Sequence, residues 1–170
     1  VFERETLQRW FARRARNAKA TRGPVTFLAD SFTSYTEPEI GRAAIELLEM
    51  AGYDVQLAGD VCCGRSLISK GLLDEARQRH AQLIATLSPS AMKGIPIVGC
   101  EPSCVFTLKD ELPNLARGDE GALAIARRAR MVDDLLAEAI DDGRLSVNPH
   151  APSAGKQILF HGHCHQKASS

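Results

Sequence analysis

Four short apolar segments, separated by sequence of helical periodicity, constrain the fold of this chain most strongly. The segments with the length and composition of buried strands are residues 25–29, 53–57, 95–98 and 156–160. Between them, apolar residues recur at intervals of three and four, which is the pattern of amphipathic helices. Strands that alternate with helices predict a parallel sheet. We therefore expect a three-layer α/β domain with helices on both faces of the sheet.

Local signals place the helices between and around these segments. Thr36 and Glu39 have the spacing of a capping box, and Asp119 is a typical N-cap. Pro89 is expected just beyond the end of its helix. Helices are thus expected over residues 3–19, after Thr36, up to Pro89, from Pro102 to Leu112, and from Asp119 to Gly143.

Composition and charge exclude several classes of protein. The 170 residues carry no net charge, so nothing global indicates nucleic acid as a partner. No apolar run approaches the ~20 residues that span a bilayer, although association with a membrane surface stays open. The five cysteines cluster instead of spreading as a disulfide framework would, which favours reduced thiols and a cytoplasmic protein. The chain begins at Val1 and ends close to one cysteine cluster, so we expect a piece of a longer polypeptide.

The N-terminal residues 1–22 form a basic segment of their own. They hold seven Lys or Arg and two Glu, a net charge of +5 that the remaining residues balance with −5. A nucleic-acid arm is one interpretation. A solvated helix face or a linker between domains is the interpretation we favour, since Trp10 and Phe11 suggest docking on protein.

The cysteines occur in three clusters. They are Asp60–Arg65 with Cys62 and Cys63, Cys100–Cys104, and His161–His165 with Cys164. A disulfide between sequence neighbours closes a strained ring and constrains little chain. Two adjacent thiols can instead reach one metal centre, and Gly64 lets the backbone pass close by. The alternative is that these are buried, inert cysteines.

Each cluster follows a predicted strand, as does the pair Asp30-Ser31. Loops after the carboxyl ends of parallel strands share one edge of the sheet, where binding sites form. We therefore predict one metal site at this edge. Its expected ligands are Cys62, Cys63, Cys104, Cys164 and His163, with Cys100, His161 and Ser31 as less certain members.

The predicted organisation has three parts. Residues 1–22 are the basic helix or linker, residues 23–155 are a first α/β unit, and residues 156–170 begin a second, truncated unit. A weak internal similarity supports this division. Phe27–Ser31 and Phe160–Cys164 each follow a predicted strand, and each has a polar or thiol residue four positions after its phenylalanine.

Four short motifs carry a resemblance to a known family. They are Glu37–Gly41, Val61–Gly64, Glu101–Cys104 and His161–Lys167. From about residue 24 onward, the sequence resembles the cysteine-rich CCG domain family. That family includes a subunit of heterodisulfide reductase and the iron–sulfur subunits of glycolate oxidase and anaerobic glycerol-3-phosphate dehydrogenase. It also includes the C-terminal iron–sulfur region of some FAD-linked dehydrogenases of 2-hydroxy acids.

The resemblance implies an iron–sulfur electron-transfer module of a flavin-dependent 2-hydroxy-acid oxidoreductase of the glycolate or lactate type. It places Cys62, Cys63 and Cys104 at ligand positions of a 4Fe–4S cluster, with Cys164 opening a second copy of the pattern. FAD would be bound by a flavin-containing dehydrogenase, present either as a partner domain or as a separate polypeptide. The chain alone is accordingly not expected to be catalytically active.

The sequence departs from the family pattern in three places. Ser31 stands where the first cysteine is expected, and serine is a poor replacement for a thiolate on iron. Cys100 lies outside the usual register, and Cys164 is the one cysteine of the second copy. Whether this chain retains a cluster is therefore left open by its sequence.

Three other functions stay open. A structural or regulatory zinc site suits three Cys and one His. A catalytic Cys164, activated by His163 or His165, would resemble thiol-dependent hydrolases. A docking module whose cysteine clusters are vestigial is the third.

Overall fold

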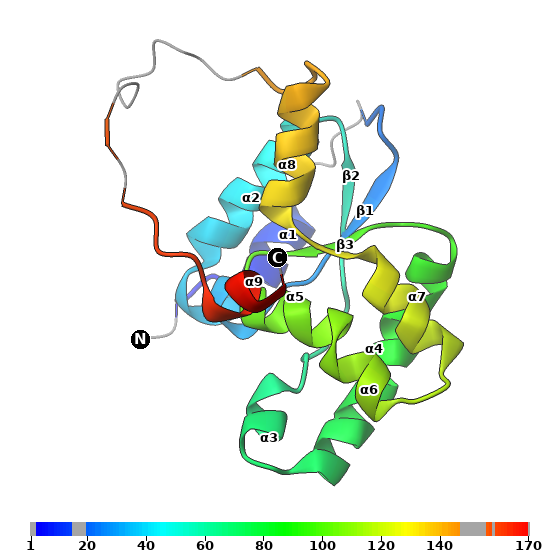
Figure 1. Cartoon of the computed structure of the whole chain (residues 1–170). Coiled ribbons are helices and arrows are strands. Elements are labelled where there is room, and N and C mark those ends of the chain that lie inside the picture. The colour runs from blue at the N-terminus through cyan, green and yellow to red at the C-terminus, as the bar shows by residue number, and fades with distance from the viewer. Residues whose placement is uncertain (1–2, 15–19, 147–155, 158, 170) are drawn as a thin grey trace.

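The computed structural model describes residues 3–14, 20–146, 156–157 and 159–169, and it has a sheet surrounded by helices (Figure 1). The strands are β1 (Pro24–Phe27), β2 (Asp54–Leu57), β3 (Ile97–Gly99) and β4 (Ala129–Met131). The helical elements are α1 (Leu7–Arg13), the π-helical turn η1 (Phe32–Thr36), α2 (Pro38–Met50), α3 (Arg65–Ser69), α4 (Leu73–Met92), α5 (Pro102–Lys109), α6 (Glu111–Leu115), α7 (Glu120–Arg128), α8 (Val132–Asp141) and α9 (Cys164–Ser169).

The four strands lie in the order β2-β1-β3-β4, and every pairing is parallel. In the register of the sheet, Val25 of β1 lies opposite Val55 of β2, and Phe27 lies opposite Val98 of β3. The carboxyl ends of all four strands therefore meet at one edge. The expected α/β class with a parallel sheet is confirmed.

The sheet separates two hydrophobic clusters, because alternate side chains of a strand point to opposite faces. Val25 and Phe27 pack with residues of α1, α2 and α8 on one face. Leu28 packs with residues of α4, α5, α6 and α7 on the other. Figure 1 shows α2 and α8 together on one side of the strands and α4, α6 and α7 on the other. The prediction of helices on both faces is confirmed.

α1 is shorter than the helix predicted over residues 3–19. It ends before Arg14, whose backbone is extended, and the last five residues of the predicted range lie outside the described residues. The Arg14 guanidinium forms an ion pair with Glu49 of α2. It also lies 5.0 Å from the ring centroid of Trp10 and 4.4 Å from that of Phe11. This end of the basic segment thus packs on the protein itself.

Gly41 explains one of the short motifs found in the sequence. It belongs to α2, and a Cβ atom at this position would lie 2.7 Å from a methyl carbon of Leu7. Glycine therefore allows α1 to approach α2 closely. The motif Glu37–Gly41 serves helix packing at this position.

The predicted fourth strand over residues 156–160 is wrong. The described part of this segment has no strand, and Leu159 and Phe160 are 102% and 85% exposed. The place beside β3 is taken by β4 instead. An apolar run becomes a strand only where an edge of the sheet is free to pair with it.

β4 interrupts the long helix that was predicted from Asp119 to Gly143. Ala129 and Met131 are buried on one face of the sheet. Arg130 points away from that cluster and lies 2.6 Å from Glu138 of α8. This alternation with a period of two spans only three residues, so the helical spacing on either side hides it.

Three smaller helix predictions are also corrected. Pro89 lies inside α4, which continues to Met92. The helix expected from Pro102 to Leu112 is divided into α5 and α6, because the ring of Pro113 in α6 is incompatible with a helical carbonyl at Lys109. The capping box at Thr36 is absent: its hydroxyl donates to the carbonyl of Phe32 in η1, at 3.1 Å. Within the described residues, no helix is both long and apolar enough to cross a membrane.

Candidate functional site

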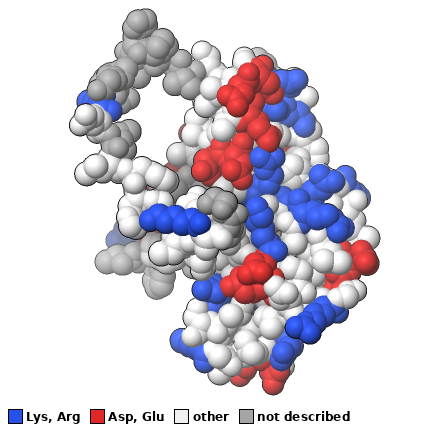
Figure 2. Space-filling view, viewed as in Figure 1, with Lys and Arg blue, Asp and Glu red and all other residues white. Residues whose placement is uncertain are grey.

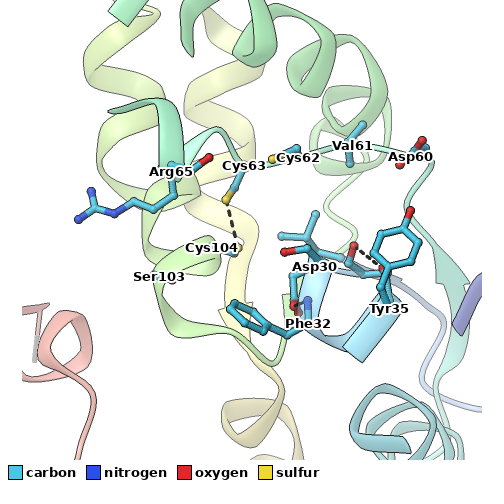
Figure 3. A pocket seen from close by; sticks show the side chains of 15 residues that line it. Asp30, Phe32, Tyr35, Asp60, Val61, Cys62, Cys63, Arg65, Ser103 and Cys104 are labelled. Carbon is cyan, nitrogen blue, oxygen red and sulfur yellow. Dashed lines mark hydrogen bonds between the residues drawn. The ribbon is translucent and has the colours of Figure 1, made fainter. Parts of the chain in front are cut away.

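A cavity of about 360 Å³ opens at the edge where the strands end. Residues from three loops line it, and they lie within the ranges 28–35, 60–66 and 103–104. These loops follow β1, β2 and β3, so the parallel topology brings them together. Figure 3 shows their side chains around this cavity. The lining includes Ser31 and three of the five cysteines.

Cys63 and Cys104 are the closest pair of chemical groups in this cavity. The thiol of Cys63 donates to the sulfur of Cys104, and the two Sγ atoms lie 3.1 Å apart (Figure 3). Cys63 is 5% exposed, whereas Cys104 in the first turn of α5 is half-buried. Two neighbouring loops therefore present a pair of sulfur atoms to one point.

Gly64 and His80 fix the backbone at the double cysteine. Gly64 has φ +76°, a left-handed conformation that glycine adopts readily, and it precedes α3. A Cβ atom there would lie 3.2 Å from Nε2 of His80. The same nitrogen lies 3.0 Å from the carbonyl oxygen of Cys63. His80 is thus a buried histidine whose hydrogen-bond partner is the cysteine loop itself.

Cys62 is the most exposed of the three cavity cysteines. Its sulfur accepts from the backbone N–H of Gly64 at 3.5 Å. A hydrogen bond with Cys63, together with burial, raises the pKa of the Cys62 thiol. The hydrogen bond to Cys104, followed by burial, raises the pKa of Cys63 to about 12, although Cys62 opposes this rise. A metal that binds these sulfur atoms must therefore displace their protons.

Asp30 shapes the wall of the cavity that faces the cysteines. Its buried carboxylate accepts from the backbone N–H groups of Phe32 and Thr33, at 2.8 and 3.1 Å, and from the Thr33 hydroxyl at 2.8 Å. These bonds close the turn that begins η1. Ser31, the candidate at the position of the family's first cysteine, is exposed on this turn and lines the cavity. Asp30 thus positions Ser31 and is itself fully engaged in hydrogen bonds.

Cys100 lies apart from the three cavity cysteines. It packs against the hydrophobic cluster of α2 and α8 and is not among the residues that line the cavity. Burial, with smaller contributions from Asp30 and Asp133, raises the pKa of its thiol to about 12. Cys100 therefore occupies the position of a small core residue at the end of a strand.

The segment with Cys164 lies beside the site but outside the cavity lining. Cys164 begins α9 and is exposed, and α9 packs on α5. His165 Nε2 lies 3.2 Å from the guanidinium of Arg65, which holds only donors, so this nitrogen accepts. His163 Nδ1 accepts from the backbone N–H of His165 at 3.2 Å, and His161 is exposed.

Arg65 is a residue of the site that sequence reasoning missed. It lines the cavity directly after Gly64 and forms an ion pair with Glu111 of α6 while it contacts His165. Its position two residues after the double cysteine is the sequence feature that could have identified it. Arg65 therefore connects the cavity lining with the C-terminal segment through its contact with His165.

The described residues contain no group of three or more His, Cys, Asp or Glu side chains arranged to hold a metal ion. Ser31, Cys62, Cys63 and Cys104 share one cavity, whereas Cys100, His161, His163 and Cys164 are not part of its lining. That any of these side chains binds a metal remains a prediction.

Comparisons with known proteins match the part of the chain that lines the cavity. Residues 27–109 match the profile of a family described as the cysteine-rich domain, CCG. These residues include η1, Gly41, the double cysteine and Cys104, so the match covers the whole cavity lining. No solved structure matches significantly.

Three curated relatives carry names of enzymes or pathways that act on hydroxylated acids or glycerol phosphate. One subunit of anaerobic glycerol-3-phosphate dehydrogenase from Escherichia coli K12 is 28% identical over 95% of this chain and 40% of its own length. Lactate utilization protein A from Oceanobacillus iheyensis is 27% identical over 75% of this chain and 50% of its own length. D-2-hydroxyglutarate dehydrogenase from E. coli K12 is 28% identical over 87% of this chain and 14% of its own length. The chain therefore spans half or less of each of these relatives.

Proposed function

Because residues 27–109 belong to the cysteine-rich domain family, we propose that this chain is an iron–sulfur electron-transfer module of a dehydrogenase. The observation that carries the proposal is the cavity at the sheet edge, where Cys62, Cys63 and Cys104 come together. The names of the relatives place similar sequences in dehydrogenases. We further propose a flavin-dependent partner that oxidises a 2-hydroxy acid of the glycolate or lactate type.

The donor set fits an iron–sulfur cluster at three of its four positions. Cys62, Cys63 and Cys104 would supply thiolates, the usual ligands of iron in such clusters. Cys164 would supply the fourth from the neighbouring α9, with His163 beside it. A 4Fe–4S cluster bound here would accept and release single electrons.

The chain's own residues would position and tune this group. His80 and Gly64 hold the Cys62-Cys63 backbone, and the first turn of α5 presents Cys104 to the cavity. Leu28 and Val61 make one part of the cavity wall apolar, which limits the access of water. Hydrogen bonding and solvent access around the sulfur atoms are the means by which a protein sets a cluster's potential.

Zinc is the second candidate, and Ser31 is the observation that favours it. Ser31 lines the cavity at the position where the family pattern has cysteine, and a hydroxyl is a poor ligand for cluster iron. A zinc site needs no cysteine there, since Cys62, Cys63 and Cys104 with one histidine make a tetrahedral set. Such a domain would be structural or regulatory, with no redox role.

One competition experiment separates these two functions. The reduced chain is incubated anaerobically with equimolar zinc and ferrous iron plus sulfide, and bound metals are then quantified beside the visible absorption and the electron paramagnetic resonance spectrum. We expect bound iron and sulfide, and a spectrum that changes when a reduced flavoprotein is added. Stoichiometric zinc with no iron, and no response to the flavoprotein, would establish the zinc site instead.

A further inference from the structure

The sulfur atoms of Cys63 and Cys104 are close enough to react with each other. Their separation of 3.1 Å exceeds a disulfide bond of about 2.05 Å by only about 1 Å. Cys63 lies in a loop between β2 and α3, and Cys104 in the first turn of α5, so a bond between them would connect two elements that already touch. The two thiols are thus already in contact in the folded chain.

The surroundings of the pair admit a small oxidant. Both cysteines line the cavity of about 360 Å³, which reaches the surface at the edge of the sheet. Cys104 is half-buried, whereas Cys63 is 5% exposed. Of these two sulfur atoms, that of Cys104 is therefore the more accessible to a molecule that enters the cavity, and the Cys63 sulfur lies 3.1 Å from it.

The other cysteines do not offer an equivalent pair. Cys62 is exposed and is the sequence neighbour of Cys63, so a bond between those two would close a strained ring. Cys100 packs against the hydrophobic cluster on the other face of the sheet. Cys63 and Cys104 belong to different segments of the chain, and their sulfur atoms lie 3.1 Å apart.

We propose that Cys63 and Cys104 form a dithiol–disulfide pair that a hydroperoxide oxidises when no metal occupies the cavity. The sulfur of Cys104 attacks one peroxide oxygen, the O–O bond breaks, and the departing oxygen takes the Cys104 proton and leaves as water or alcohol. The sulfur of Cys63 then attacks the sulfenic sulfur of Cys104, the S–O bond breaks, and the Cys63 proton leaves with that oxygen as water. The two sulfur atoms are oxidised by two electrons in total, and the peroxide is reduced by the same two.

The disulfide would protect the site as well as close it. A cysteine held at the sulfenic stage can be oxidised further and irreversibly, whereas a disulfide is restored by a thiol reductant. The oxidised pair cannot bind metal, because a metal requires thiolates. A peroxide would thus convert the site reversibly between a metal-binding and a non-binding form, whichever metal the thiols bind.

Peptide mapping of the metal-free chain tests the proposal. The reduced 170-residue chain, stripped with a chelator, is treated with one equivalent of hydrogen peroxide, blocked with N-ethylmaleimide and digested with trypsin. We expect two of the five thiols to become unreactive and peptide 43–65 to be linked to peptide 94–109. Dithiothreitol should separate the two peptides. An unlinked map with sulfinic or sulfonic acid at Cys104 would overturn the proposal.

Variants assign the link, because each of the two peptides carries two cysteines. A chain with both Cys62→Ser and Cys100→Ser should form the link as completely as the unaltered chain. Cys63→Ser should abolish it and leave a sulfenic acid at Cys104 that dimedone traps. Circular dichroism of each variant verifies the fold. A link that survives in Cys63→Ser, or disappears in the double variant while the fold is retained, would contradict the assignment. Because metal is absent throughout, these outcomes do not depend on which metal the site binds.

Discussion

The Nε2 atom of His80 lies 3.0 Å from the carbonyl oxygen of Cys63. A buried side chain on α4 thereby holds the backbone of the loop that presents two of the cavity cysteines. Figure 2 shows both basic and acidic side chains on the visible face of the molecule. The carbonyl of Cys63 is therefore held from inside the fold.

Removal of this imidazole should loosen the cysteine loop. His80→Ala leaves the Cys63 carbonyl without its partner and opens a cavity in the core, so we expect a loss of about 2–4 kcal/mol in the free energy of unfolding. Urea denaturation of the metal-free chain measures this loss. Gln78→Ala, at an exposed position of the same helix, is the matched control and should cost little. Equal losses in both variants would contradict the role of His80.

Acid should destabilise the fold through the same residue. Burial lowers the pKa of His80, an effect that the hydrogen bond to Cys63 and the nearby Glu111 carboxylate partly offset. As the pH falls below the ordinary histidine pKa of about 6.5, His80 binds a proton in the unfolded chain but not in the folded chain. The free energy of unfolding therefore decreases. We expect the free energy of unfolding to decrease by no more than about 1.4 kcal/mol per pH unit from this group.

The assignment of this pH dependence to His80 can be verified by comparing histidine variants. His80→Asn should flatten the decrease between the ordinary pKa and the lowered one, whereas His161→Asn, at an exposed position, should leave it unchanged. An unchanged slope in His80→Asn would assign the pH dependence to other groups.

Gly64 should be costlier to replace than a glycine of the same backbone conformation elsewhere. Gly64→Ala must adopt φ +76° and places a Cβ atom 3.2 Å from His80. Gly71→Ala must adopt φ +74° but meets nothing within 4 Å. Each alanine should cost about 1–2 kcal/mol for the left-handed backbone, and Gly64→Ala should cost more because His80 must also shift. Thermal unfolding of the two variants gives the comparison, and equal losses would show that the contact with His80 has no effect.

Metal uptake should release protons. Because hydrogen bonding and burial raise the pKa of Cys63 to about 12, this thiol is protonated at neutral pH and must lose its proton to bind. The apparent affinity for zinc should rise about tenfold per pH unit for each thiol proton displaced. Isothermal titration in buffers of different ionisation enthalpy counts these protons. A binding constant that does not change between pH 6 and 8 would exclude protonated thiols as ligands.

The sequence alone was sufficient to predict that the loops with Ser31, Cys62 and Cys104 meet at one edge of the sheet. It was not sufficient to predict the strand β4. Apolar runs near β1, β2 and β3 were long enough to recognise, and parallel topology then determined that Ser31, Cys62 and Cys104 would meet. β4 was hidden because Ala129 continues the helical spacing of its neighbours and the strand is only three residues long. Local periodicity cannot reveal which segment pairs with a free edge, since that depends on tertiary contacts.

The C-terminal segment shows the same limit. Residues 156–160 are apolar enough for a strand, but the described ones are exposed, and Cys164 consequently begins a helix beside the cavity instead of ending a strand at its edge. The hydrogen bond between His165 and Arg65 joins residues that are one hundred positions apart in the sequence. No spacing rule in the sequence could have predicted this contact.

The iron and sulfide content of cysteine variants after anaerobic reconstitution tests the central claim most directly. We predict about four irons and four sulfides per unaltered chain, the composition of a 4Fe–4S cluster. Cys100→Ser, which alters a cysteine outside the cavity lining, should retain this content, whereas Cys63→Ser and Cys104→Ser should lose most of it. Full iron and sulfide in both cavity variants, or a loss confined to Cys100→Ser, would contradict the proposal that this cavity holds the cluster.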